Sequence, residues 1–125
     1  MSNRQPTEGA QEAVGVLRVG RTSDAGVTTL MFTGDLDIAT LVEAEDAVAA
    51  AEREAPDVLV VDLSALAFLD SSGVRLVLQA EARARAAGRR LAVVLGTGRA
   101  LRLFEVLGLL NRLEVVEGPD GLSGV

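Results

Sequence analysis

The segment Val58-Leu-Val-Val-Asp-Leu-Ser-Ala-Leu-Ala-Phe-Leu-Asp70-Ser71-Ser72-Gly73 contains an apolar run that ends abruptly in a carboxylate, two hydroxyls and a glycine. The near-continuous apolar residues from Val58 to Leu63 predict a strand buried on both faces in the middle of a sheet. After the polar turn, a helix is expected to run to Ala87 and to be ended by Gly88, which suits a left-handed backbone. The turn Asp70 to Gly73 therefore lies where a central strand passes into a helix.

The residues before this segment predict a hairpin followed by a helix. Strands are expected at Val14 to Arg21 and at Val27 to Thr33, joined by turn-forming residues at Ser23 to Gly26. The sequence Gly34-Asp35-Leu36-Asp37 is interpreted as a polar break after the second strand.

The first helix is expected to begin at Thr40, whose hydroxyl and the carboxylate of Glu43 have the spacing of a capping box. It should end at about Glu54, because Ala55-Pro56 does not continue a helix. The residues expected on its inner face are Leu41, Ala44, Val48 and Ala51.

The residues after the central helix predict a strand at Arg90 to Leu95, a third helix at Arg99 to Leu107 and a last strand at Leu113 to Val116. The order β-β-α-β-α-β-α-β predicts an α/β fold, a mixed and mostly parallel β-sheet with helices packed on it. We expect one domain over residues 14–117, with a flexible arm at 1–13 and a flexible tail at 118–125.

Composition excludes several classes of function. The chain has 125 residues, of which 49% are hydrophobic, and a formal net charge of −6, which argues against binding to nucleic acid or to anionic membranes. It has no cysteine and no histidine, so thiol nucleophiles, imidazole bases and cysteine-ligated metals are excluded. No signal or membrane-spanning segment is recognised, so the cytoplasm is the expected location. We expect no enzymatic activity, no cofactor and no metal.

The turn Asp70 to Gly73 is the strongest candidate site. An anion on Ser71 or Ser72 could be held by the unpaired amides and the dipole of the helix that follows, so either serine is a plausible phosphate carrier. Gly73 would keep the loop open for another protein's active site. The simpler interpretation is that Asp70 or Ser71 caps the helix and that Gly73 relieves crowding against the sheet.

Other candidates carry weaker signals. Asp37 and Asp70 each follow a strand and could flank one cleft, but no third metal ligand is evident, so two loop-capping groups are the simpler interpretation. A serine hydrolase lacks both the Gly-x-Ser-x-Gly elbow and a histidine. Gly96-Thr97-Gly98-Arg99 lacks the lysine of a phosphate-binding loop and is interpreted as a turn with a helix cap.

The helix after the turn has two predicted faces. The stripe expected to face the sheet is Gly73, Leu76, Val77, Ala80, Ala84 and Ala87. Val74 and Leu78 point the other way, beside Arg75. They either form a small patch that binds a partner or pack beneath the third helix or a neighbouring loop.

Three motifs in order carry a family resemblance. These are Gly34-Asp35-Leu36-Asp37, the segment from Asp62-Leu63-Ser64 to Phe68-Leu69-Asp70-Ser71-Ser72-Gly73, and Leu103-Phe104-Glu105-Val106-Leu107-Gly108-Leu109. With these motifs the chain resembles STAS domains, and among them the stand-alone anti-sigma factor antagonists.

The resemblance implies a switch rather than an enzyme. In the family the residue corresponding to Ser71 is phosphorylated by a partner that is both an anti-sigma factor and an ATP-dependent serine kinase. The unphosphorylated protein binds that partner and releases the sigma factor, and a PP2C-type phosphatase resets it. The implied interface consists of Asp37, Asp70, Ser72, Gly73, Val74, Arg75 and Leu78.

Two departures and one alternative accompany the resemblance. Asp35 stands where relatives have glutamate, and the last helix of many relatives is expected to be short or absent here. Relatives also share the fold without a kinase partner, in stressosomes, transporter tails and lipid-transport complexes. The alternative function is therefore a structural subunit of a stressosome-like or transporter-associated complex, in which Ser71 is only a helix cap.

Overall fold

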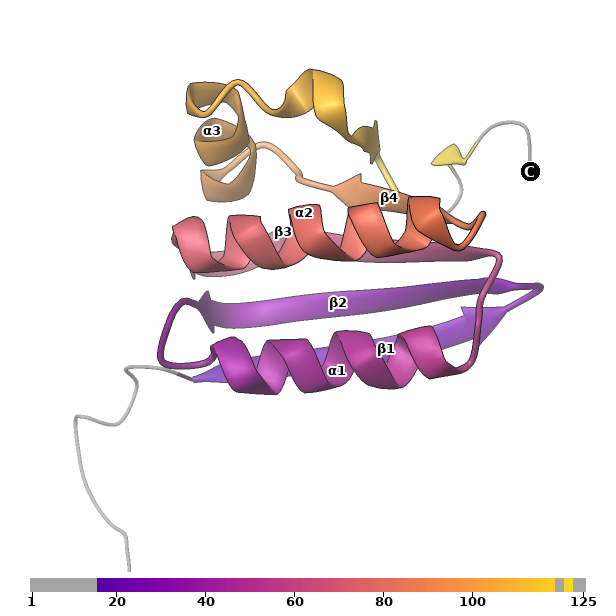
Figure 1. Cartoon of the computed structure of the whole chain (residues 1–125). Coiled ribbons are helices and arrows are strands. Elements are labelled where there is room, and N and C mark those ends of the chain that lie inside the picture. The colour runs from indigo at the N-terminus through magenta and orange to yellow at the C-terminus, as the bar shows by residue number, and fades with distance from the viewer. Residues whose placement is uncertain (1–15, 119–120, 123–125) are drawn as a thin grey trace, which may run out of the picture.

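The computed structural model describes residues 16–118 and 121–122, which form one mixed sheet with helices packed on it (Figure 1). The strands lie in the order β1-β2-β3-β4-β5; β1 is antiparallel to β2, and all other pairs are parallel. The elements are β1 Leu17–Asp24, β2 Val27–Leu36, α1 Leu41–Arg53, β3 Val58–Leu69, α2 Ser71–Ala86, β4 Arg90–Val94, α3 Arg99–Val106, the 3₁₀ helix η3 Leu110–Arg112 and β5 Glu114–Val116. The predicted α/β class and element order are confirmed, and η3 is an addition to them.

The predicted central strand is the middle strand of the sheet and is longer than expected. β3 pairs with β2 up to Leu69, whereas its pairing with β4 covers only Val58 to Asp62. One face of the sheet forms the main core with the three helices, in which Phe32, Val61 and Phe104 are fully buried. Val58 and Val60 alternate with the core residues and belong to a second buried cluster, so β3 is buried on both faces as predicted.

The hairpin forms, but its strands extend beyond the predicted limits. Ser23 and Asp24 belong to β1, and the turn is only Ala25-Gly26, with φ values of 51° and 82°. Two successive positive φ values are those of a type I′ turn, which matches the twist of a hairpin. Val14, the predicted start of the first strand, lies outside the described residues.

The predicted polar break after the second strand is wrong, because β2 continues to Leu36. Gly34 pairs with Leu66 and Leu36 with Leu69, after shifts of register near Gly34. Gly34 has a φ of +92°, and a Cβ there would lie 2.4 Å from the carbonyl oxygen of Val16. A glycine lets the strand pass this point, and β2 and β3 then end level with each other.

Helices α2 and α3 follow the predicted faces over most of their lengths. Leu76, Val77 and Ala80 are buried against the sheet, but the last residue of the predicted stripe, Ala87, is exposed. On α3, Ala100 and Phe104 are buried, whereas Leu107 is 46% exposed. In both cases the helix ends before the predicted residue.

The predicted flexible arm at 1–13 lies outside the described residues, as does most of the predicted tail at 118–125. Within that tail, Leu122 packs against the second buried cluster, which contains Val58, Val60 and Val94. Within the described part of the chain, no helix is both long and apolar enough to cross a membrane.

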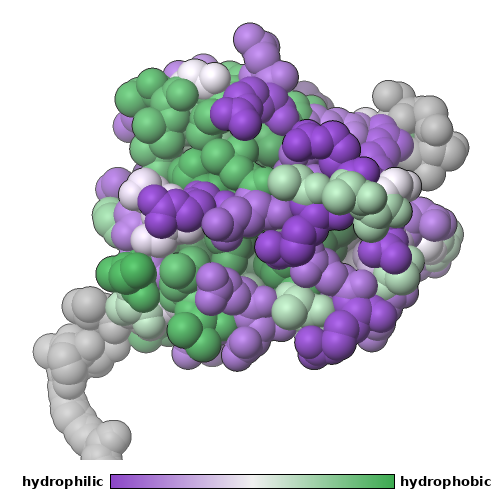
Figure 2. All heavy atoms as spheres, in the orientation of Figure 1, coloured by the Kyte–Doolittle hydropathy of each residue, from purple (hydrophilic) through white to green (hydrophobic). Residues whose placement is uncertain are grey.

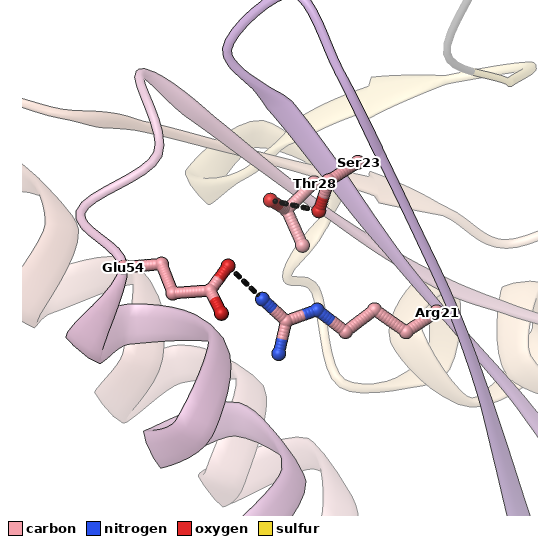
Figure 3. A network of polar contacts seen from close by, with 4 residues as sticks. All are labelled: Arg21, Ser23, Thr28 and Glu54. Atoms are coloured by element: carbon pink, nitrogen blue, oxygen red, sulfur yellow. Dashed lines mark hydrogen bonds and ion pairs between the residues drawn. The ribbon is translucent and has the colours of Figure 1, made fainter.

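Polar contacts tie the edge strand β1 to its neighbours (Figure 3). Arg21 of β1 forms an ion pair with Glu54, which follows α1. The hydroxyl oxygens of Ser23 and Thr28 lie 3.0 Å apart across the hairpin. The ion pair holds the turn end of the hairpin against the carboxyl end of α1, and the hydroxyl contact joins the two strands of the hairpin to each other.

The other edge strand, β5, is held by an ion pair as well as by its backbone. Arg90 at the start of β4 donates from its Nε and from an Nη to the two carboxylate oxygens of Glu114 at the start of β5. Hydrogen bonding from Arg90 lowers the pKa of Glu114 below its ordinary value of 4.5. Since β5 has only three residues, this side-chain pair adds to a short backbone ladder.

Gly73 determines how closely the start of α2 approaches the ends of β2 and β3. It is buried, and a Cβ at this position would lie 2.5 Å from Leu69 Cδ1 and 2.8 Å from Leu36 Cγ. Both leucines belong to the main core and cannot move aside without disturbing it. The expectation that Gly73 leaves room for another protein is therefore wrong, and the expectation that it relieves crowding against the sheet is confirmed.

We predict that Gly73→Ala destabilises the protein, although alanine is the better helix former. Helix propensity favours alanine by about 1 kcal/mol, while overpacking a filled core costs about 1–3 kcal/mol. Contacts as short as 2.5 and 2.8 Å place Gly73 in the upper part of that range, so we expect a net loss of about 1–2 kcal/mol. The measurement is the free energy of unfolding in urea. Gly118→Ala is the control, because no atom lies within 4 Å of a Cβ there and the residue lies outside the helices. An unfolding free energy equal to that of the wild type would contradict the packing argument.

We predict that Glu114 makes the stability of the protein depend on pH. Because its folded pKa is lowered, its contribution is complete above the unfolded pKa, near 4.5, and is lost as the pH falls through the folded pKa. The melting temperature of Glu114→Gln should lie below that of the wild type at pH 7, and the two should converge in acid. A difference that stays constant from pH 7 down to strongly acid conditions would contradict this assignment.

Candidate functional site

The candidate site lies where β2 and β3 end side by side, at the left of Figure 1. The backbone N–H of Asp70 donates to the carbonyl oxygen of Leu36 at 3.2 Å, which joins the loop after β3 to the loop after β2. Asp37 directly follows Leu36, so the two candidate carboxylates, Asp37 and Asp70, follow neighbouring strand ends. The parallel pairing of the strands thus brings together two loops that are more than thirty residues apart in the sequence.

Asp70 caps helix α2. Its backbone is extended, with φ −116° and ψ −175°, and its Oδ1 accepts a hydrogen bond of 2.8 Å from the N–H of Ser72. Its carbonyl oxygen accepts from the N–H groups of Gly73 and Val74 at 3.1 and 3.3 Å. The predicted capping role of Asp70 is therefore present, and a negative charge lies at the positive end of the α2 dipole.

Asp37 has a similar role in the loop that leads into α1. Its Oδ1 accepts from the N–H groups of Ala39 and Thr40 at 2.9 and 3.2 Å. The fully buried Thr40 hydroxyl donates to the carbonyl oxygen of Asp35 at 2.8 Å and accepts from the N–H of Asp37 at 3.1 Å. Thr40 makes no side-chain capping bond to α1, so the predicted capping box with Glu43 is wrong. The hydroxyl is used to close the loop instead.

The two serines of the turn have different surroundings. Ser71, the first residue of α2, is exposed, and no hydrogen bond of its hydroxyl occurs among the described residues. Ser72 is half-buried, and its N–H is held by Asp70. Ser71 is therefore the hydroxyl that a second protein can reach without disturbing the cap.

Three further residues of the predicted interface on α2 also differ in exposure: two are buried or partly buried, and one is exposed. Val74 is only 4% exposed and belongs to the main core, so its expected place in a surface patch is wrong. Leu78 is partly buried and packs against the same core. Packing, the second alternative offered by the sequence, describes both residues. Arg75 is exposed and forms no ion pair within the described part of the chain.

Two apolar residues that the sequence analysis did not select are exposed at this end of the molecule. Ile38, in the loop after Asp37, is 74% exposed, and Val42, in the first turn of α1, is 68% exposed. Figure 2 shows apolar side chains gathered on the surface at this end, over the start of α1. Their signal in the sequence is a pair of apolar residues, four apart, that does not belong to the inner face of α1.

A groove lies between α1 and the start of α2, where Ser72, the residue after Ser71, lines it. It has a volume of about 230 Å³. The residues that line it are Ile38, Leu41, Glu45, Ser72, Arg75, Leu76 and Gln79. We name this groove, together with the exposed side chains of Ile38 and Val42, the α1–α2 face. It combines apolar surface with both signs of charge, as a protein-binding surface does.

The described residues contain no group of three acidic side chains arranged to hold a metal ion. Asp37 and Asp70 each accept hydrogen bonds from backbone N–H groups, which is the loop-capping role that the sequence also offered for them. The arrangement is thus an exposed hydroxyl next to the capping residue Asp70, at the end of the sheet where the loop of Asp37 also lies, with a groove of mixed polarity between α1 and the start of α2.

Several solved structures share this fold. An anti-sigma factor antagonist from Mycobacterium paratuberculosis is 23% identical, with a TM-score of 0.78 over 86% of this chain and 91% of that one. The anti-sigma factor antagonist SpoIIAA in its unphosphorylated form is 20% identical, with a TM-score of 0.65 over 81% of this chain and 88% of that one. The phosphorylated form of SpoIIAA, a Bacillus cell fate determinant, gives a TM-score of 0.61 at 20% identity, over 81% and 91% of the two chains.

The family itself is shown by the sequence. No curated protein matches the chain. A protein-family model described as "Mlab, STAS domain" matches residues 19–117, which include every element from β2 to β5 and most of β1. With this match over most of its length, and with the fold of the structures above, the chain belongs to the STAS domain family.

Proposed function

We propose that this protein is an anti-sigma factor antagonist that is switched by phosphorylation of Ser71. In its unphosphorylated form it binds an anti-sigma factor that is also an ATP-dependent serine kinase, and the sigma factor is released. Phosphorylation of Ser71 by that kinase ends the binding, and a PP2C-type phosphatase restores it. The protein is then a substrate and a binding module in the cytoplasm rather than an enzyme.

The observation that carries the proposal is the position of Ser71. It is exposed at the first residue of a helix, and the next residue, Ser72, lines a groove that can receive a partner. The neighbouring residues already have structural roles: Asp70 caps the helix, and the backbone of Gly73 is packed against Leu36 and Leu69. A kinase can therefore reach Ser71 while the fold stays intact.

The α1–α2 face supplies the surface on which the partner would bind. Ile38 and Val42 would be covered by the partner, and exposed apolar side chains of this kind supply affinity when they are buried. Arg75 and Glu45 line the same groove as Ile38 and Ser72. Their side chains can pair with opposite charges on the partner. Of the interface residues expected from the sequence, Asp37, Asp70, Ser72 and Arg75 remain in this proposal, while Val74, Leu78 and Gly73 support the fold.

Electrostatics explains how one phosphate ends the binding. A phosphoserine adds nearly two negative charges at neutral pH. The carboxylate of Asp70 already occupies the N-terminal amide of α2, so the phosphate cannot take that position without repelling it. Arg75 lies four residues further along α2, at the spacing of an i, i+4 pair, so it is the nearest helical position able to pair with the phosphate. The phosphate thus places negative charge near the groove. It also competes with the partner's acidic groups for pairing with Arg75.

The likeness to SpoIIAA supports the same proposal. SpoIIAA, whose fold this chain shares, is an anti-sigma factor antagonist with solved phosphorylated and unphosphorylated forms. In the proposed complex the kinase brings the nucleotide, the metal and the catalytic base. This agrees with a sequence that has no histidine and no cysteine.

A second candidate is a constitutive subunit of a stressosome-like or transporter-associated complex. It is favoured by the structural role of the turn from Asp70 to Gly73. Asp70 caps α2 and Gly73 packs against the sheet, and neither contact requires a phosphate. In this case Ser71 carries no modification and the α1–α2 face binds a partner permanently.

We predict that Ser71→Asp weakens binding to the cognate anti-sigma kinase by about tenfold or more, which is about 1.4 kcal/mol or more. Ser71→Ala should bind as the wild type does and should take up no phosphate from the kinase and ATP, whereas Ser72→Ala should still be phosphorylated. Calorimetry gives the affinities, and mass spectrometry gives the modified residue.

The control for charge alone is Thr22→Asp, which adds a carboxylate to the exposed surface of β1 near the hairpin turn, away from Ser71. It should leave the affinity unchanged. Equal affinities of Ser71→Asp and the wild type would reject the switch. Stable co-purification with partners that are not kinases, and no phosphate on Ser71, would favour the constitutive subunit.

A further inference from the structure

A second hollow lies at the opposite end of α2 from Ser71, between the carboxyl ends of α1 and α2 and the amino ends of β3 and β4. It has a volume of about 250 Å³. Its lining residues are Glu52, Pro56, Leu59, Arg83, Ala84, Ala87, Arg89 and Arg90. Since α2 has sixteen residues, the two sites are about 24 Å apart along the helix.

Small side chains leave this space open. Ala84 and Ala87 belong to the stripe of α2 that the sequence directs toward the sheet, and at these positions the helix contributes only a methyl group to the lining of the hollow. Leu59 is almost fully buried and forms an apolar floor. The helix then ends at a turn in which the N–H of Arg89 donates to the carbonyl oxygen of Ala84 at 2.8 Å. This turn brings two arginines, Arg89 and Arg90, to the mouth of the hollow.

The mouth is basic on a chain whose net charge is −6. Three arginines line the hollow against one carboxylate, that of Glu52. Arg83 pairs with Glu52, with Nε 3.0 Å from Oε2, and Arg90 pairs with Glu114 on β5. Arg89 is exposed and forms no ion pair within the described part of the chain. The charge of Arg89 is therefore available to an anion from outside.

We propose that this hollow binds a small anionic amphiphile, a carboxylate with a short aliphatic chain. The chain would lie on Leu59, Pro56 and the two alanines, and the carboxylate would be held at the mouth by Arg89, with Arg83 beside it. The volume is below the roughly 300–1,000 Å³ of sites for drug-sized ligands, which restricts the ligand to a single short chain. The proposal does not depend on the switch at Ser71.

The test is titration of the ¹⁵N-labelled protein with octanoate below its micellar concentration, followed by NMR. We expect saturable shifts of the amides of Leu59, Ala84 and Ala87. Octanamide has the same chain without the charge, and acetate has the charge without the chain. The affinity for each should be lower than that for octanoate by a factor of about ten or more. Ala87→Leu, at an exposed position that lines the hollow, should fold normally and lose binding because its side chain occupies the space.

The matched variants are Arg89→Glu and Arg102→Glu, which make the same change of charge at two exposed arginines, of which only Arg89 lines this hollow. Arg89→Glu should weaken octanoate binding about tenfold or more, and Arg102→Glu should leave it unchanged. An equal loss in both variants, equal binding of octanoate and octanamide, or the absence of saturable shifts would overturn the proposal. Binding to vesicles of anionic phospholipid without any response to octanoate would also overturn it, in favour of a lipid surface.

Discussion

The parallel pairing of β2 with β3 is the interaction on which the rest of this structure depends. It continues past the end of β4 to Leu36 and Leu69, so the last part of β3 has a strand neighbour on one side only. That extension brings the two polar loops to one end of the sheet, where the N–H of Asp70 binds the carbonyl oxygen of Leu36. If β2 ended at Thr33, as its sequence suggests, no strand pairing would hold Asp37 close to the start of α2.

The turn after β3 serves the fold and the proposed switch with different atoms. The carboxylate of Asp70 holds the N–H of Ser72, and Gly73 allows α2 to lie against the core leucines. These contacts do not use the hydroxyl of Ser71, which is exposed. The cap and the close packing thus fix the backbone on both sides of Ser71, which sets the position from which its hydroxyl is presented.

The two ends of α2 differ in the chemistry that they offer. At its amino end an exposed serine lies beside carboxylates and apolar side chains, while at its carboxyl end a hollow with an apolar floor is bordered by arginines. The chain is acidic overall, so the basic border is a local feature made by the turn after α2. Both sites exist because two helices lie next to each other on the same face of the sheet (Figure 1).

Much of the fold and part of the site could be predicted from the sequence. The apolar run beginning at Val58, the polar turn at Asp70 and the three motifs determined the α/β class, the order of the elements and the candidate serines, because these follow from local periodicity and from short motifs. Only the tertiary structure decided that β2 continues to Leu36, that Val74 is buried, that Thr40 closes a loop instead of capping α1, and that Ile38 and Val42 are exposed. Periodicity states which residues share a face of one element, but burial depends on what a second element places against that face, and this is known only after the strands and helices have packed.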